Sequence, residues 1–247
     1  MLADAAAALR SWNDRRWPTP CPRWSSLVAQ CRAEAITTAR ARTKQLRAAE
    51  RIRVVEVLDA LDRTVPRDRV LVQENGLADM WSYFWPYWTC HAAGGSVVPS
   101  EQTTLGFGAA AAVGVKLGQP ARPVVALVGD GAFRLFQADL ATAADAGVGL
   151  LYVVLDNGGY GWLQHQLDRA GGAAARVATG VPDSIDSAVP CRRVWWEQVA
   201  ARNDLAPALA RAWSRCVDGQ VAVVRIAVGL DDPPPCLWPP AEQQEES

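Results

Sequence analysis

Short, uninterrupted apolar runs recur through the middle of the chain, and each predicts a strand that is buried on both faces. The runs cover residues 70–72, 124–128, 150–155 and 221–228. Between them lie stretches with the apolar or small-residue spacing of helices, at 106–118, 133–144 and 160–169. Strands without alternation that are separated by helices are typical of a parallel sheet with helices on both faces. The pattern therefore predicts an α/β fold built on a doubly wound parallel sheet.

Three regions of different composition divide the chain. Residues 1–62 predict a helical extension, because apolar positions recur three and four apart and a basic run lies between Arg32 and Arg53. Residues 63–230 hold the predicted strands, although the segment 194–199 favours neither a helix nor a strand. Residues 231–247 are proline-rich and then acidic, which predicts a disordered tail.

Composition and charge narrow the class of protein. Half of the 247 residues are hydrophobic, 21% are charged and the net charge is −1, which predicts a soluble globular protein with neither a nucleic-acid nor a membrane partner. The six cysteines are widely spaced and accompany only two histidines, so a zinc site is not expected. Neither a signal peptide nor a membrane span is recognisable. We therefore expect reduced cysteines in a cytoplasmic protein.

Two of the predicted strands end in glycine turns that carry oxygen donors. Gly129, Asp130 and Gly131 follow one strand, and a run from Asp156 to Gly161 follows the next. Ligands of open parallel sheets bind beyond the carboxyl ends of the strands. A carboxylate, an amide oxygen and a backbone carbonyl form an all-oxygen set that suits Mg²⁺, which commonly shares its shell with phosphate. A helix that starts here would also turn free N–H groups towards an anion, so the sequence predicts a magnesium-bound diphosphate.

These segments resemble the GDG…NN signature of thiamine-diphosphate (ThDP) enzymes. Gly129-Asp-Gly131 matches its first part, and Asn157 follows Asp130 by 27 positions, which fits that family. The branch of acetolactate synthase and benzoylformate decarboxylase is most similar. Leu155-Asp-Asn-Gly-Gly-Tyr-Gly161 resembles its LNNGGYG run, and the segment 104–114 resembles its upstream run. The resemblance implies the diphosphate-binding, C-terminal domain of such an enzyme, with ThDP and Mg²⁺ as cofactors. It also implies that the helical extension at 1–62 corresponds to the end of the middle domain that precedes it in that family.

The resemblance also implies a role for each residue of the motif. Asp130 and Asn157 would bind Mg²⁺ through their side chains, and Gly159 through its carbonyl. Leu105 would prop the cofactor in its bent form, and Thr103 would offer its carbonyl to the aminopyrimidine ring. The other cofactor-binding positions are Gly129, Gly131, Ala132, Tyr160 and Gly161, and the candidate substrate contacts are Trp162 and His165.

Two features set the chain apart from that branch. The first asparagine of the usual pair is Asp156 here, which adds a negative charge near the diphosphate. Members of the branch also carry a pyrimidine-binding domain with the glutamate that activates the cofactor, and no glutamate of this chain stands in such a motif. We therefore expect a split enzyme, a heterodimer or heterotetramer in which a second subunit supplies that domain.

Two further features leave alternatives open. Six aromatic residues lie between Trp81 and Trp88 and form either a contact surface for a partner or a local core. Glu74, at the end of the first predicted strand, is either a turn residue or a neighbour of the cofactor.

Three functions compete for this sequence. The leading one is a ThDP- and magnesium-dependent subunit that decarboxylates a 2-oxo acid and ligates the fragment to a second carbonyl, as acetolactate synthase does, with simple decarboxylation as the alternative. A non-catalytic, degenerate partner of a ThDP enzyme is the second, which Asp156 favours and Asp130 opposes. A nucleotide-binding Rossmann module is the third, but Arg134 replaces the last glycine of its GxGxxG turn.

Overall fold

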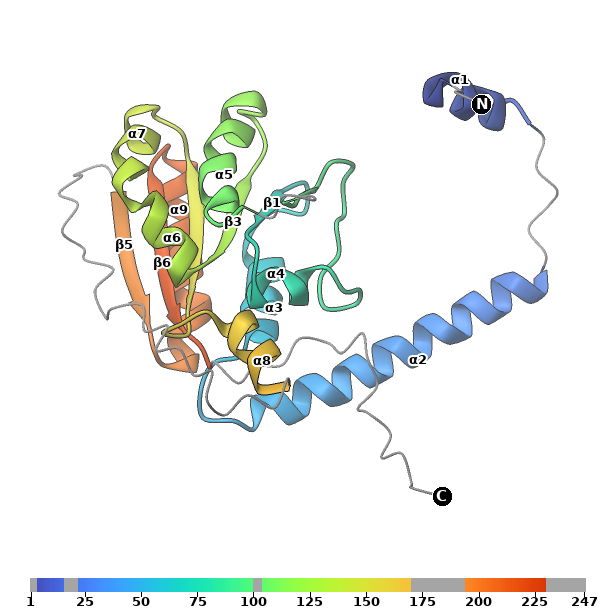
Figure 1. The fold of residues 1–247 in the computed structure, drawn as a ribbon, viewed down its shortest axis with the longest axis horizontal. Helices are drawn as coiled ribbons and strands as arrows, with labels where there is room; N and C mark the ends of the chain where they lie inside the picture. Colours follow the sequence, from blue (N-terminus) through green and yellow to red (C-terminus); the bar gives the residue numbers. More distant parts are fainter. Residues whose placement is uncertain (1–3, 16–21, 100–103, 170–193, 230–247) are drawn as a thin grey trace. The chain divides into compact units, whose positions relative to one another are not determined.

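The computed structural model describes residues 4–15, 22–99, 104–169 and 194–229 (Figure 1). Contacts divide the chain into two compact units, residues 1–41 and 42–247. The first unit contains α1 (Ala5–Asn13) and most of α2 (Pro22–Arg47), which ends in the second unit. Among the helices of the described ranges, none combines the length and the apolar character that crossing a membrane requires.

A sheet of six parallel strands forms the centre of the second unit, in the order β2-β1-β3-β4-β6-β5. The strands are β1 (Val70–Gln73), β2 (Ser96–Val97), β3 (Val124–Gly129), β4 (Leu150–Asp156), β5 (Val194–Val199) and β6 (Val221–Ala227). The four apolar runs of the sequence are confirmed as β1, β3, β4 and β6. Sequence reasoning missed β5, because Glu197 and Gln198 interrupt its apolar pattern, which an edge strand tolerates.

The helices of this unit are α3 (Val54–Thr64), α4 (Leu77–Ser82), α5 (Phe107–Gly118), α6 (Asp130–Phe136), α7 (Leu140–Asp145), α8 (Gly161–Arg169) and α9 (Leu205–Val217). The predicted helices at 106–118 and 160–169 are confirmed as α5 and α8. The single helix expected at 133–144 starts earlier, at Asp130. It is divided by a 3₁₀ turn, η1 (Gln137–Asp139), into α6 and α7.

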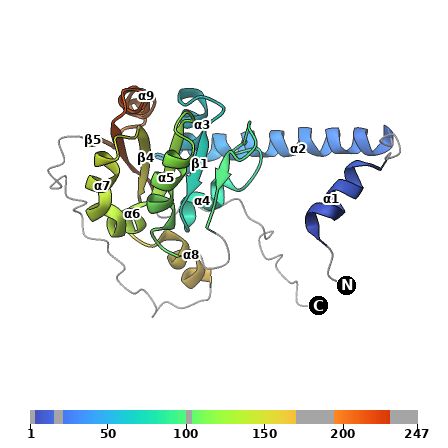
Figure 2. The same ribbon diagram turned by 90° about the horizontal axis from the view of Figure 1, so that it is seen from above.

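Alternate residues of the central strands face opposite sides of the sheet, and each side has its own core. Leu127 and Val153 pack with α3 and α9 on one side. Val128 and Tyr152 pack with α5, α6 and α7 on the other. Figure 2 shows these two helix layers flanking the strands. The doubly wound parallel sheet is therefore confirmed.

Residues 42–62, which the sequence grouped with the N-terminal extension, belong by contact to the unit that contains the sheet. The reason is the burial of α3, in which Val57, Leu58 and Leu61 have no exposed surface. The compact unit therefore starts before the predicted boundary at residue 63. The correspondence of residues 1–62 to the end of a middle domain stays a prediction, and the predicted tail at 231–247 lies outside the described residues.

The aromatic segment from Trp81 to Trp88 divides between core and surface. Trp81 and Trp88 are buried, and Trp81 meets Tyr87 edge to face with 5.0 Å between ring centroids. Tyr83 and Trp85 are exposed by 46% and 45%. The two buried tryptophans therefore belong to a local core. Tyr83 and Trp85 are exposed enough to take part in a contact surface.

Candidate functional site

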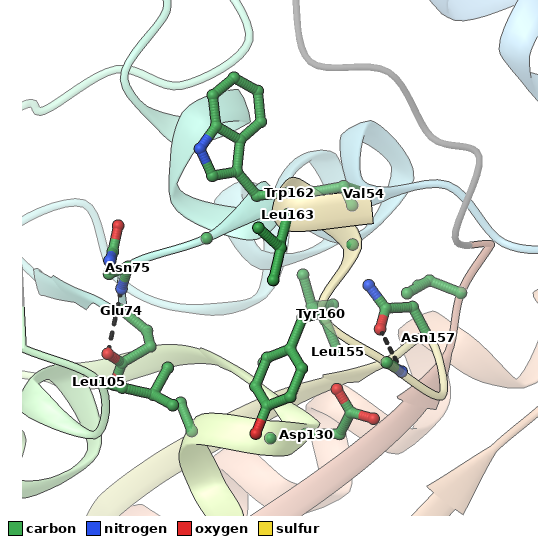
Figure 3. A pocket seen from close by; sticks show the side chains of 17 residues that line it. Val54, Glu74, Asn75, Leu105, Asp130, Leu155, Asn157, Tyr160, Trp162 and Leu163 are labelled. Atoms are coloured by element: carbon green, nitrogen blue, oxygen red, sulfur yellow. Dashed lines mark hydrogen bonds between the residues drawn. The ribbon is translucent and has the colours of Figure 1, made fainter. Parts of the chain in front are cut away.

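The order of the sheet reverses between β1 and β3, because the chain leaves β1 towards β2 and leaves β3 towards β4. Ligands of doubly wound sheets bind at such a reversal, beyond the carboxyl ends of the strands. A pocket with about 790 Å³ of empty space, its open mouth included, lies there. The predicted site residues whose side chains are described line it, from Leu105 through 129–132 to Asn157 and 159–162 (Figure 3). Thr103 and the side chain of His165 lie outside the described residues.

Asp130 provides a buried carboxylate at one end of this pocket. It is the first residue of α6, directly after β3, and only 3% of its surface is exposed. Burial, and then the neighbouring charge of Asp156, raise the pKa of Asp130 to about 6. A buried carboxylate in this position is a strong site for a cation, because a bound cation would compensate the cost of its burial.

This burial predicts that Asp130 destabilises the chain when no metal is bound. Its ordinary pKa is 3.8 and its folded-state pKa is about 6, so ionisation costs stability as the pH rises through that interval and the full cost is present above it. In the presence of a chelator, Asp130→Asn is expected to raise the free energy of unfolding at pH 7 by about 1–3 kcal/mol, and by less at pH 5. Denaturant unfolding at both pH values measures the effect, with the exposed Asp139→Asn as control. A variant no more stable than wild type at pH 7 would contradict it.

The turn after β4 brings a second oxygen donor to the same end of the pocket. The side-chain oxygen of Asn157 accepts a hydrogen bond from the N–H of Gly159 at 3.1 Å, and the carbonyl of Gly159 accepts one from Gly161 at 3.1 Å. Gly158, between them, has φ +73°, in the left-handed region that glycine adopts without strain. Figure 3 shows Asp130 and Asn157 next to each other, so the two predicted strand ends do meet.

Asp156, the residue that departs from the family pattern, forms an ion pair with an arginine. Arg225 on β6 donates from Nε to Asp156 Oδ2 at 2.7 Å, and its terminal nitrogen lies 2.6 Å from the same oxygen. Both side chains are less than one-fifth exposed. Sequence reasoning missed Arg225, although a charged residue inside the apolar run of β6 is itself a signal, because buried charges require partners.

The glycine of the other turn is held close to an aromatic ring. A Cβ on Gly131 would stand 3.0 Å from the ring of Tyr160, so the contact leaves no room for a side chain unless the ring moves. Tyr160 remains 40% exposed at the mouth of the pocket. Tyr160 therefore packs against the glycine turn that contains Asp130.

The remaining lining is mostly apolar. Val54 contributes from the start of α3, Val228 from the position directly after β6, and Leu155 from the end of β4. Trp162 and Leu105 also line the pocket, and the side chain of Leu105 is 38% exposed. Sequence reasoning did not assign Val54 or Val228 to the site, because their segments are distant in the sequence and meet through tertiary contacts such as the bridge between Ile52 and Val228.

The donor set of the pocket suits a metal-bound anion. Among the lining residues that the structure describes there is no lysine or arginine, so a bound diphosphate would need another cation. No three His, Cys, Asp or Glu side chains of the described ranges gather as a metal site. Asp130, Asn157 and the Gly159 carbonyl leave positions open for phosphate oxygens and water, the incomplete protein shell that Mg²⁺ commonly has.

Known proteins resemble this domain in sequence. The family model "Thiamine pyrophosphate enzyme, C-terminal TPP binding domain" matches residues 75–226, thiamine pyrophosphate being another name for ThDP. Benzoylformate decarboxylase of Pseudomonas aeruginosa is 36% identical over 124 residues, which are 46% of this chain and 21% of that protein. The acetolactate synthase large subunit of Lactococcus lactis is 29% identical over 114 residues, 46% of this chain and 19% of that protein. The matched part is thus about a fifth of each relative.

Solved structures show the same fold. The ThDP-dependent 4-hydroxybenzoylformate decarboxylase of Rhodococcus jostii superposes with a TM-score of 0.65 at 24% identity, over 75% of this chain and 34% of that one. The family match begins at Asn75, two residues after the end of β1, and extends to Ile226 in β6, so it includes the ends of β3 and β4 that border the pocket. The chain therefore belongs to the thiamine pyrophosphate enzyme family and carries its C-terminal, cofactor-binding domain.

Proposed function

We propose that this chain binds the diphosphate of ThDP through Mg²⁺ in the pocket between the ends of β1, β3 and β4. One observation carries the proposal: Asp130 and Asn157 meet at one end of a pocket whose described lining has no basic side chain. Asp130, Asn157 and the Gly159 carbonyl hold the metal. The amides of Gly131 and Ala132 lie in the first turn of α6, where N–H groups have no helical carbonyl to bond, and they would donate to the diphosphate.

The other predicted residues orient the cofactor and the substrate. Leu105 would support the cofactor, and the carbonyl of Thr103 would accept a hydrogen bond from its aminopyrimidine. Tyr160 covers the glycine turn, while Trp162 and His165 contact the substrate. When bound, ThDP supplies an electron sink for decarboxylation of a 2-oxo acid.

We propose that a second subunit supplies the pyrimidine-binding domain and the activating glutamate. The open mouth of the pocket supports this, because Leu105, Tyr160 and Leu163 are exposed there by 38%, 40% and 46%. Among the described lining residues Glu74 is the one glutamate, and its carboxylate already accepts backbone hydrogen bonds. We place the protein in the cytoplasm, which the free thiols of Cys31, Cys90 and Cys216 support.

For the reaction we propose acetolactate synthase-like carboligation after decarboxylation. Simple decarboxylation is the second candidate, favoured by the higher identity to benzoylformate decarboxylase, 36% against 29%. Incubation of the purified protein with a panel of 2-oxo acids separates them. An aldehyde as the sole product would indicate decarboxylation, and a 2-hydroxy ketone or 2-hydroxy-3-oxo acid would indicate carboligation.

Purification under native conditions from the source organism tests the proposal as a whole. We expect an intact complex whose mass includes a second, different chain and which contains one ThDP for each copy of this chain. A complex of this chain alone, without bound ThDP even after Mg²⁺ and cofactor are added, would contradict the proposal and favour the degenerate partner. If a complex of this chain alone contained ThDP, the proposal of a second subunit would be wrong and the proposal of cofactor binding would stand.

A further inference from the structure

Glu74 is a buried carboxylate that the proposed cofactor chemistry does not use. It directly follows β1 at the point where the sheet order reverses, and only 1% of its surface is exposed. A buried carboxylate is costly unless N–H donors surround it. The contacts of Glu74 therefore indicate what it does.

Both oxygens of Glu74 accept hydrogen bonds from backbone N–H groups. Oε1 accepts from Gly106 at 3.0 Å and from its neighbour Asn75 at 3.1 Å, and Oε2 accepts from Gly108 at 2.8 Å. Gly106 is the N-cap of α5, and Gly108 is the second residue of that helix. The carboxylate thus caps α5 from a different element, and its negative charge lies at the positive end of the helix dipole.

The two bonds to glycine hold the turn that carries Leu105. Gly106, the next residue, has φ +91°, a conformation that other residues adopt only with strain. Gly108 lies so close to β1 that a Cβ would stand 2.7 Å from the carbonyl oxygen of Gln73. Burial cannot fix Leu105 itself, because the side chain is 38% exposed. The position of Leu105 at the pocket therefore depends on the backbone that Glu74 holds.

We propose that Glu74 is a positioning residue, which fixes the turn at 104–108 so that Leu105 supports the bound cofactor. The role of Leu105 in this inference rests on the proposed function. The role of Glu74 in holding the turn rests on its hydrogen bonds alone. Glutamate suits the position because its two oxygens accept from two N–H groups at once. Glutamine has one acceptor oxygen, and its NH₂ group would face the second N–H.

The test compares Glu74→Gln with a matched control, Glu56→Gln. Glu56 is also a buried carboxylate near the start of a helix, where it accepts from the N–H of Arg53 at 3.0 Å and from Arg202 at 2.8 Å. It belongs to α3, which packs on the other side of the sheet from α5. Loss of stability alone would therefore appear in both variants.

Amide hydrogen exchange of the full chain without cofactor measures directly how firmly the turn at 104–108 is held. We expect the amides of Gly106 and Gly108 to exchange about tenfold faster or more in Glu74→Gln and at the wild-type rate in Glu56→Gln. Should Glu74→Gln not fold, Glu74→Asp, which keeps the charge but shortens the reach, is expected to act in the same direction. Unchanged exchange at both glycines in a folded variant would overturn the proposal.

Affinity for ThDP in saturating Mg²⁺ tests whether Glu74 acts through Leu105. We expect Glu74→Gln to weaken binding roughly tenfold in the wild-type background and less than about twofold in a Leu105→Ala background, since coupled residues are not additive. Equal losses in both backgrounds would overturn the link to Leu105. These affinities are measured on the assembled native complex. If the wild-type complex bound no ThDP, the proposed function would fail, and the exchange rates would still decide the role of Glu74.

Discussion

Replacing Asp130 by alanine is expected to remove magnesium-dependent binding of ThDP, with a loss of affinity on the order of a hundredfold or more. Asp130 is the one carboxylate beside Asn157 in the described lining of the pocket, and that lining offers no lysine or arginine to replace the metal. The fold is expected to persist, because the substitution removes a buried charge rather than a packed apolar group. Calorimetric titration with ThDP, with Mg²⁺ and with a chelator, measures the loss.

Asp139→Ala is the matched control for this substitution. Asp139 lies in η1, directly after α6, and is exposed, so its loss removes the same charge from the same region without touching the pocket. The control is expected to bind ThDP as the wild type does. If Asp130→Ala bound ThDP with wild-type affinity, Asp130 would not be a ligand of the metal. Unchanged turnover of the assembled complex carrying Asp130→Ala would show that this chain is a non-catalytic partner.

The pair of Asp156 and Arg225 is expected to behave as a single unit in a double-mutant cycle. Either Arg225→Met or Asp156→Asn alone leaves a largely buried charge without its partner, and each is expected to lower the free energy of unfolding by about 2–3 kcal/mol. The double variant is expected to recover to within about 1 kcal/mol of wild type. It should also bind ThDP about as tightly as the wild type does, because the substitutions remove one negative and one positive charge together and leave the net charge near Asp130 unchanged.

The exposed pair of Arg211 and Glu197 provides the control cycle. Arg211 is 55% exposed, so solvent screens its interaction and a much smaller coupling is expected. Additive losses in the cycle of Asp156 and Arg225 would show that Arg225 does not compensate the acidic substitution. In that case the negative charge of Asp156 would again argue for a weakened cofactor site.

The parts of the fold that sequence reasoning predicted are those that local patterns determine. Val124 to Val128 and Leu150 to Leu155 are buried on both faces, and a strand with that environment must be apolar throughout. Their glycine turns follow directly, so the meeting of Asp130 and Asn157 required only that the strands be parallel neighbours. The edge strand β5 has one neighbour, and its mixed sequence therefore carried no clear period.

The parts that could not be predicted depend on contacts between distant segments. Asp156 pairs with a residue 69 positions away, and the register of β4 against β6 that brings them together is a tertiary property. Glu74 meets the start of α5 across more than 30 positions. From the sequence alone, Asp156 was an added negative charge that favoured a degenerate partner, and Glu74 was either a turn residue or a neighbour of the cofactor, because the partner of neither residue is visible in a linear motif.

The most direct test of the metal-bound cofactor is the position of Mn²⁺, used in place of Mg²⁺, in crystals of the native protein grown with ThDP. The account predicts an anomalous manganese peak within about 2.0–2.3 Å of oxygens from Asp130, Asn157 and the Gly159 carbonyl, with the diphosphate completing the shell and Leu105 against the cofactor. Cofactor bound without a metal at these residues, or a pocket that stays empty at saturating ThDP and Mn²⁺, would contradict it.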